Sequence, residues 1–236
     1  MSVAILGATG AVGAALARRV SASGRTPWLI GRSLPKLESL ASELGGAPVT
    51  VADCADCASL GEALSKPPAD LNGLAYCVGN IQLKPLKRSS VDDFRAMLDL
   101  HLVSAAESIK ALEAPLKKNK SSVVLFSSVA VQQGFQNHAL ISSAKGAVEG
   151  LTRALAADLS PSVRVNAIAP SISKSGMAEP MLGKEAMAQA LAKGHPMART
   201  GLPDDHAALA HFLLSDEATW ITGQIIGVDG GRSAVA

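Results

Sequence analysis

The sequence predicts a doubly wound α/β fold, in which helices cover both faces of one parallel sheet of about seven strands. Short apolar runs with strand character alternate with longer stretches of helical spacing along the whole 236-residue chain. Several short runs are apolar at consecutive positions, which is typical of strands buried on both faces. Strands that alternate with helices form βαβ crossovers, and these make neighbouring strands parallel. The expected strands are Val3–Leu6, Trp28–Ile30, Val49–Val51, Leu74–Val78, Val123–Phe126, Val163–Ile168 and Gln224–Val228.

The expected helices lie between these strands. Ser33 precedes the second helix as a candidate N-cap, and Asp204 gives the last helix an acidic first turn. Residues 171–194 are rich in Ser, Gly, Met and Lys and interrupt the alternation. We therefore expect a single domain over residues 1–236, with a mobile substrate lid at about 171–194. The helical stretches are Ala11–Ser21, Leu34–Leu44, Leu60–Ser65, Val91–Lys118, Ala139–Leu159, Glu185–Lys193 and Asp204–Leu214.

The composition argues against several classes of protein. Hydrophobic residues make up 48% and charged residues 18%, which is too apolar for a disordered chain. The net charge is only +2 and the basic residues are scattered, so we expect no nucleic-acid partner. No leader-like segment precedes Val3 and no apolar run is long enough for a membrane span, so we expect a cytoplasmic protein without a membrane partner. Cys54 and Cys57 form a CxxC without a second pair or a nearby histidine, so we expect no metal site.

A glycine-rich turn follows the first expected strand directly. Gly7, Gly10 and Gly13 alternate with Thr9 and Val12 in this segment, and the first helix begins within it. Glycine lets the backbone turn sharply and lets a pyrophosphate approach closely. The N-terminus of the helix offers unpaired N–H groups and the positive end of its dipole to phosphates. The turn therefore predicts a dinucleotide site in a Rossmann fold, with a tight turn without a ligand as the alternative.

The end of the second strand bears on the choice of cofactor. A carboxylate there would bind the adenosine ribose and repel a 2′-phosphate. Arg32 instead can form a bidentate pair with a phosphate, and Ser33 adds a hydroxyl, so we expect NADP(H) to be preferred over NAD(H). In the alternative, Arg32 stacks on adenine or faces solvent. Asp53, after the third strand, is expected either to accept a hydrogen bond from the adenine amino group or to cap the following helix.

Nearly the whole chain resembles the short-chain dehydrogenase/reductase family. The resemblance rests on the glycine turn, Asp53, Gly79, Ser128 and Lys145, and on the Asn-Ala-Ile-Ala-Pro run at 166–170. It implies hydride transfer between NAD(P) and a carbonyl or alcohol, with a tyrosine that exchanges the proton. By the same resemblance, Lys145 holds the nicotinamide ribose and Ser128 hydrogen-bonds the substrate oxygen. The remaining implied cofactor contacts are Cys54, Val78, Gly79, Pro170, Ser171, Ser173 and Ser175.

The proton-delivery residues depart from the family's pattern. Ile141 stands at the tyrosine position and exchanges no proton, and His101 stands at the position of an asparagine that supports a proton relay. His138 is the leading replacement for the tyrosine. It precedes Lys145 by seven residues, a spacing that resembles the Tyr-x6-Lys of divergent enoyl reductases. An imidazole also donates protons near neutral pH. A helix cap or a solvent-facing histidine is the alternative. His101 is the second candidate, expected behind Lys145 where it tunes that lysine, unless it is only packed within its helix.

Two functions follow from this pattern. The first is an NADPH-dependent reductase with a non-standard proton donor, whose small-molecule substrate is a carbonyl or an activated C=C compound. The methionines of the lid favour an apolar carbonyl or enone. The second is a catalytically silent NADP(H)-binding sensor or scaffold, which the missing tyrosine suggests. The resemblance also implies a homodimer or homotetramer that pairs through Val91–Lys118 and Ala139–Leu159.

Overall fold

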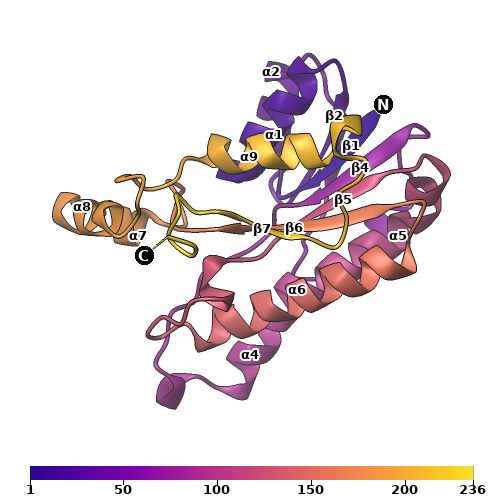
Figure 1. Cartoon of the computed structure of the whole chain (residues 1–236). Coiled ribbons are helices and arrows are strands. Elements are labelled where there is room, and N and C mark those ends of the chain that lie inside the picture. The colour runs from indigo at the N-terminus through magenta and orange to yellow at the C-terminus, as the bar shows by residue number, and fades with distance from the viewer. Residues whose placement is uncertain (236) are drawn as a thin grey trace.

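Seven parallel strands form the centre of the molecule, in the order β3-β2-β1-β4-β5-β6-β7 (Figure 1). The computed structural model describes residues 1–235. All six neighbouring pairs of strands are parallel, which confirms the predicted doubly wound sheet. The strands are β1 (Ser2–Leu6), β2 (Thr26–Gly31), β3 (Val49–Val51), β4 (Leu71–Tyr76), β5 (Ser122–Phe126), β6 (Arg164–Pro170) and β7 (Ile225–Val228).

Helices cover both faces of this sheet, as Figure 1 shows. Successive residues of β1 point into different cores: Val3 and Ile5 pack under one helical layer, whereas Ala4 and Leu6 pack under the other. This division explains why the strand is apolar at consecutive positions. The first layer contains α1 (Ala11–Ala22), α2 (Leu34–Glu43) and α9 (Pro203–Leu213), and the second contains α3 (Leu60–Ala63), α4 (Val91–Leu98), α5 (Ser104–Lys118) and α6 (Ala139–Asp158).

The expected helix over residues 91–118 is continuous but not regular. A π-helical turn, Asp99–Val103, separates α4 from α5. The hydroxyl of Tyr76 donates to the Leu100 carbonyl at 2.7 Å, and the hydroxyl of Ser104 donates to the Asp99 carbonyl at 2.8 Å. Side chains therefore satisfy carbonyls at the point where the helical ladder is disturbed, as buried acceptors require.

Two smaller predictions are corrected. β4 begins three residues earlier than expected and ends at Tyr76, so Val78 lies in the following loop. Ser33 is the N-cap residue of α2, but its side chain accepts no hydrogen bond from the helix, so the predicted side-chain cap is wrong. That hydroxyl therefore stays available to another partner.

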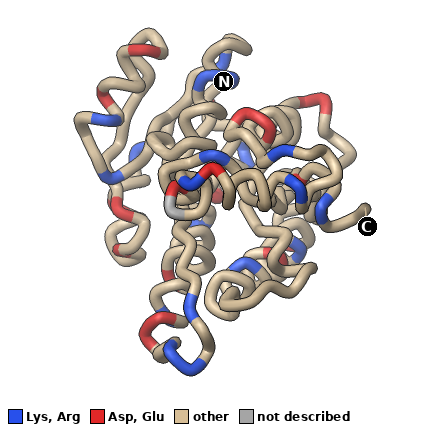
Figure 2. The backbone as a smooth tube through the Cα atoms, turned by 90° about the vertical axis from the view of Figure 1, so that its left-hand side faces the viewer, with Lys and Arg blue, Asp and Glu red and all other residues tan. Residues whose placement is uncertain are grey.

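The segment at 171–194 lies beyond the carboxyl ends of the strands. It contains α7 (Glu179–Leu182) and α8 (Glu185–Lys193), which project from the left side of the sheet in Figure 1. α8 has the predicted bounds, and the mobility of the lid stays a prediction. None of the described helices combines the length and the apolar character that a membrane span requires. Figure 2 shows basic and acidic residues interspersed along the backbone.

Candidate functional site

The glycine turn packs so closely that side chains have no room in it. Gly7 adopts a φ of 76°, and a Cβ there would lie 3.0 Å from the Cys77 carbonyl carbon. A Cβ on Gly13 would collide with the Gly7 carbonyl oxygen. Gly10 is the N-cap of α1, and no side chain caps the N–H groups of that helix. An anion can therefore reach the positive end of α1, so this turn fits a pyrophosphate.

The residues expected at the adenosine end lie beside this turn. Arg32 is exposed directly after β2, with no carboxylate of the described chain within 4.0 Å of its guanidinium. Burial raises the pKa of the Cys54 thiol to about 11, and the nearby charge of Arg32 opposes this rise in pKa. One oxygen of Asp53 accepts a hydrogen bond from the Ala55 N–H at 3.0 Å, which fixes the turn. Asp53 thus caps a turn, whereas α3 begins only at Leu60.

Lys145 lies in α6, and its side chain is buried. Its ammonium donates a hydrogen bond to the Phe126 carbonyl at 2.7 Å. No ion pair involves Lys145 in the part of the chain that the structure describes. Burial disfavours the charged form and lowers the pKa of Lys145 from 10.5 to about 7, although Cys77 partly opposes the shift. This lysine can therefore exchange a proton near neutral pH.

Gly79 is the point where Lys145 and His101 meet. A Cβ on Gly79 would lie 2.8 Å from Cε1 of His101 and 3.8 Å from Nζ of Lys145. Any larger residue would have to displace the imidazole. The structure thus places His101 beside Lys145, and glycine is the residue that permits this contact.

His101 is buried and neutral. Its Nε2 lies 3.2 Å from the side-chain oxygen of Asn80 and 3.5 Å from the backbone N of the same residue, so both polar groups of Asn80 face this nitrogen. Nδ1 has no hydrogen-bond partner among the described residues. Burial, and then the charge of Lys145, lower the pKa of His101 to about 3. His101 is therefore neutral near pH 7 and does not act as a cationic acid.

Ile141 fills the expected tyrosine position with an apolar side chain. It is 4% exposed and packs with Met97, Leu140 and Ala144, between α4 and α6. Ser128 lies at the end of β5, where its oxygen accepts from the Ala130 N–H at 3.2 Å and its own hydrogen stays available. The site therefore retains a hydroxyl donor but no phenol.

His138 lies at the N-cap position of α6 and is partly exposed. Its Nδ1 lies 2.7 Å from the Gln136 carbonyl, which only accepts, so Nδ1 is assigned the hydrogen and Nε2 is free. The side chain makes no capping hydrogen bond, so the helix-cap alternative is wrong. The Phe135 ring lies 5.2 Å from the imidazole, centre to centre.

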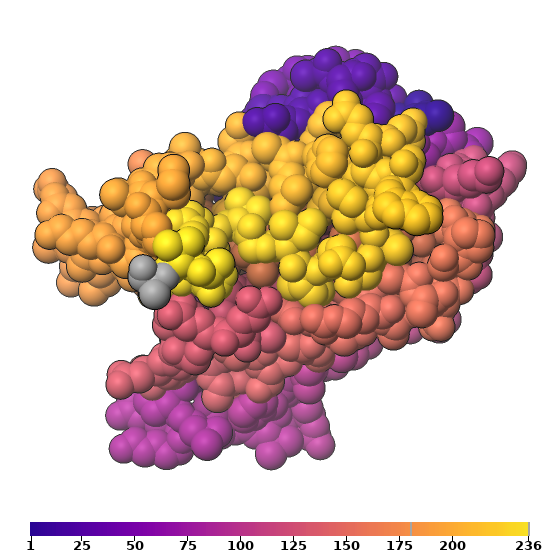
Figure 3. Space-filling view, viewed as in Figure 1, coloured from indigo at the N-terminus to yellow at the C-terminus, as the bar shows by residue number. Residues whose placement is uncertain are grey.

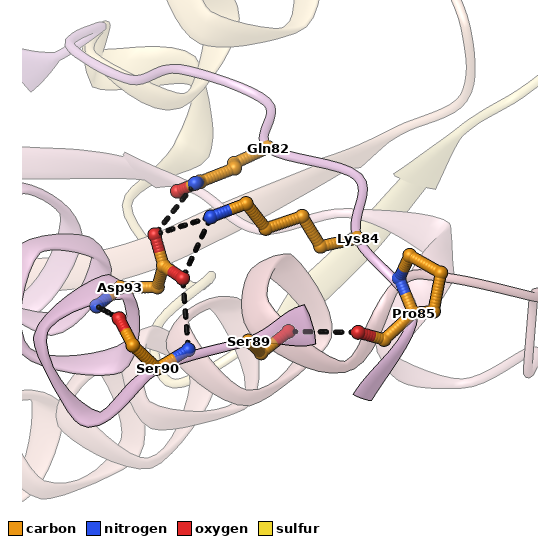
Figure 4. Close-up of polar contacts among 6 residues, drawn as sticks. All are labelled: Gln82, Lys84, Pro85, Ser89, Ser90 and Asp93. Carbon is orange, nitrogen blue, oxygen red and sulfur yellow. Dashed lines mark hydrogen bonds and ion pairs between the residues drawn. The ribbon is translucent and has the colours of Figure 1, made fainter. Parts of the chain in front are cut away.

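A second loop supports the segment that bears His138. The Lys84 N–H donates to the Asn137 carbonyl at 3.1 Å. Figure 4 shows how this loop is fastened: Lys84 and Gln82 both donate to Asp93, which forms a capping box with Ser90 at the start of α4. The hydrogen bonds from Lys84 hold the pKa of Asp93 well below its usual range. The backbone next to His138 is therefore linked, through this loop, to the start of α4.

The start of the lid is tied to histidines that the sequence did not assign. After Pro170, the Ser171 hydroxyl donates to Nε2 of His195 at 2.8 Å, since Nδ1 of that ring faces the Leu191 carbonyl. Ser173 pairs with Nε2 of His206. Both hydroxyls are thus engaged within the protein, which weakens them as cofactor ligands. The Ser175 oxygen accepts from the next turn, and its hydrogen makes only a 3.5 Å contact with the Ser173 carbonyl.

Four further residues make contacts around this site although the sequence predicted no site role for them: Tyr76, Asn80, His195 and His206. Tyr76 is the one tyrosine of the chain and stands three residues before Gly79, which marks it in the sequence. Its hydrogen bond to the π-turn, described above, fixes the segment that bears His101. The partners of the three others are set by the fold and leave no pattern in the sequence.

Comparisons with known proteins identify the family. Residues 7–233 match the family model described as Enoyl-(Acyl carrier protein) reductase. "Inactive 2-(S)-hydroxypropyl-CoM dehydrogenase 2" from Xanthobacter autotrophicus is 32% identical over 93% of this chain and 100% of its own. "2-(S)-hydroxypropyl-CoM dehydrogenase 3" from the same organism is 43% identical, but that match spans only 53% of this chain and 51% of the relative.

Solved structures agree with this result. A putative NAD(P) dependent gluconate 5-dehydrogenase from Beutenbergia cavernae, with bound NADP at low occupancy, is 28% identical with a TM-score of 0.90. The match covers 99% of this chain and 96% of that one. A short chain dehydrogenase/reductase family protein has a TM-score of 0.92 at 27% identity, and covers 100% and 98%. The chain belongs to the short-chain dehydrogenase/reductase family.

Proposed function

We propose that the protein is an NADPH-dependent reductase of a carbonyl or an activated C=C compound, with a proton donor that replaces the family's tyrosine. The observation that carries this proposal is the meeting of Lys145 and His101 at Gly79, beside a glycine turn that fits a pyrophosphate. A buried lysine whose pKa lies near neutrality is the kind of group that proton transfer uses.

The chain offers a candidate group for each part of the cofactor. The turn at 7–13 would hold the pyrophosphate, Arg32 and Ser33 the 2′-phosphate, Asp53 the adenine, and Lys145 the nicotinamide ribose. The other proposed contacts come from the loops after β3, β4 and β6, and NADPH supplies the hydride when bound. The relative solved with NADP supports NADP(H) over NAD(H). Arg32→Asp should reverse the ratio of NADPH to NADH dissociation constants; an unchanged ratio refutes the role of Arg32.

Two of the chain's residues would receive the substrate oxygen. The free hydrogen of Ser128 can be donated to that oxygen, where negative charge develops. His138 would deliver a proton from Nε2 when its ring is doubly protonated, and the neutral ring left behind keeps the hydrogen on Nδ1 that faces the Gln136 carbonyl. Lys145 is the second possible donor, and it would deliver its proton through water.

The test follows NADPH oxidation at 340 nm with a panel of ketones, quinones and enones. Wild type is compared with His138→Gln, Ser128→Ala and the control His211→Gln on α9. We expect the first two variants to lose about a hundredfold or more in kcat, with the control unaffected. No turnover with any substrate refutes the reductase.

Ile141 favours a second candidate, a silent NADP(H)-binding sensor or scaffold. Ile141 is an apolar residue where the family has its proton-donating tyrosine, and it packs among other apolar side chains. The relative from Xanthobacter autotrophicus that matches 93% of this chain is named as inactive. This candidate predicts NADPH binding without turnover and no effect of His138→Gln on binding. Ile141→Tyr separates the two, because a relic with an intact pocket would gain ketone reduction.

We also propose that two or four copies assemble through α5 and α6, as members of this family commonly form oligomers. Static light scattering on the purified chain tests the state directly. A monomer at all concentrations refutes the assembly.

A further inference from the structure

The C-terminal segment places an arginine beside the proposed proton donor. The guanidinium carbon of Arg232 lies 5.0 Å from the centre of the Phe135 ring, which in turn contacts His138. A Cβ on Gly194, at the end of the lid, would lie 3.3 Å from a guanidinium nitrogen. Figure 3 shows the yellow C-terminal residues between the orange lid and the rose-coloured segment before α6. Arg232 therefore stands where these three segments meet.

The backbone around Arg232 is fixed by a carboxylate that does not pair with it. Asp229 accepts hydrogen bonds from the N–H groups of Gly231 and Ser233, both at 2.9 Å. The Arg232 N–H donates to the Asp229 carbonyl at 3.3 Å. Asp229 thus forms the turn that presents Arg232, and its oxygens are occupied by the backbone of Gly231 and Ser233 and by the Ser233 hydroxyl.

The guanidinium itself keeps its hydrogen-bonding capacity. Over residues 1–235, no carboxylate lies within 4.0 Å of it. Arg19 and Arg199 differ in this respect: they line the neighbouring cavity of about 440 Å³ and are paired with Asp204 and Asp205. Stacking on Phe135 restricts the side chain of Arg232 while leaving its planar N–H groups free.

We propose that Arg232 binds an anionic group at the end of the substrate away from the reacting carbon, so that the substrate is a short-chain keto or enone compound with a carboxylate or a phosphoryl-type anion. The inference rests on the proposed reductase, because it takes the carbonyl to lie near Ser128 and His138. A guanidinium forms bidentate hydrogen bonds with either anion. The guanidinium of Arg232 lies 5.0 Å from the centre of the Phe135 ring, and that centre lies 5.2 Å from the centre of the His138 ring. These two distances limit the separation of Arg232 and His138, so a substrate with a few carbon atoms between its carbonyl and its anionic group can reach both.

The test measures binding, so it does not depend on turnover. Wild type, Arg232→Gln, Arg232→Lys and the control Lys66→Gln are titrated calorimetrically, with and without NADPH. The probes are 4-oxopentanoate and 5-oxohexanoate, their methyl esters, and the phosphonate analogue of the first acid. Lys66→Gln removes the same charge from an exposed residue before β4, at the other end of the strands.

We expect wild type and Lys66→Gln to bind each acid about tenfold more tightly than its ester. Arg232→Gln should bind acid and ester alike with an unchanged melting temperature, and Arg232→Lys should keep part of the preference. The titration with the phosphonate shows whether a carboxylate or a phosphoryl-type anion binds more tightly. Equal binding of acid and ester by wild type, no binding of any anion, or an unchanged preference in Arg232→Gln overturns the proposal. Absent NADPH binding overturns the proposed reductase alone, since the titrations without NADPH still measure the anion preference.

Discussion

Lys145→Met should stabilise the protein by an amount that depends on pH. Because burial lowers the pKa of Lys145 from 10.5 to about 7, the unfolded chain binds one more proton than the folded chain between these values. The stability of wild type therefore rises with pH across this window, by about 1.4 kcal/mol per pH unit where the effect is fully developed. Methionine carries no such penalty. The gain in unfolding free energy that comes from removing this burial penalty is thus greatest below pH 7 and disappears above pH 10.5.

Between about pH 7.5 and about pH 9.5, the difference in unfolding free energy between the two proteins should shrink by about 2 kcal/mol. The lost hydrogen bond to the Phe126 carbonyl shifts the difference without reversing this trend. Urea denaturation followed by the fluorescence of Trp28, which is 3% exposed, measures both free energies. Lys118→Met, at an exposed lysine of α5, is the control and should give a flat difference. A flat difference for Lys145→Met as well would show that Lys145 titrates at its ordinary pKa, and would remove it as a proton donor.

Three further substitutions test the surroundings of the site. Tyr76→Phe should lower the unfolding free energy by about 1–2 kcal/mol in urea, because the buried Leu100 carbonyl loses its donor; wild-type stability would contradict the role of that hydrogen bond. Gly13→Ala should weaken NADPH binding at least about tenfold in a fluorescence titration, because the new Cβ collides with the Gly7 carbonyl, whereas Gly61→Ala, whose Cβ meets nothing within 4 Å, should bind normally. Gly79→Ala should move the imidazole resonances of His101 in the NMR spectrum, and unshifted resonances would mean that the contact does not exist in solution.

The fold can be predicted from the sequence because the patterns that indicate it lie within short segments. Val3–Leu6 is apolar at every position because both faces of β1 are covered, and the same logic applies to the neighbouring strands. The glycine turn is likewise readable, since its positions are set by contacts within a few residues and with one adjacent strand. These features require no knowledge of distant partners.

The candidate site is less predictable because its contacts join distant segments. Tyr76 and Leu100 are 24 residues apart, and Ser171 and His195 are 24 apart as well. Helical periodicity over residues 91–118 gives no sign of a π-turn, because the turn depends on hydrogen bonds from another strand. The sequence therefore predicts which groups the site contains, but not which of them are neighbours or which nitrogen of His138 is free.

The π-turn also sets the angle about the helix axis between the apolar face of α4 and the apolar face of α5. A π-turn accommodates about one residue more than an α-helix does, and one residue corresponds to a rotation of about 100° about the axis. Upstream of it, Met97 faces Ile141; downstream, Ile109 and Leu112 face the sheet. Deleting a single residue between 99 and 103 would restore a uniform helix and swing one of these apolar stripes into solvent. The number of residues in this short interval is therefore fixed by the packing of the helices on both sides of it.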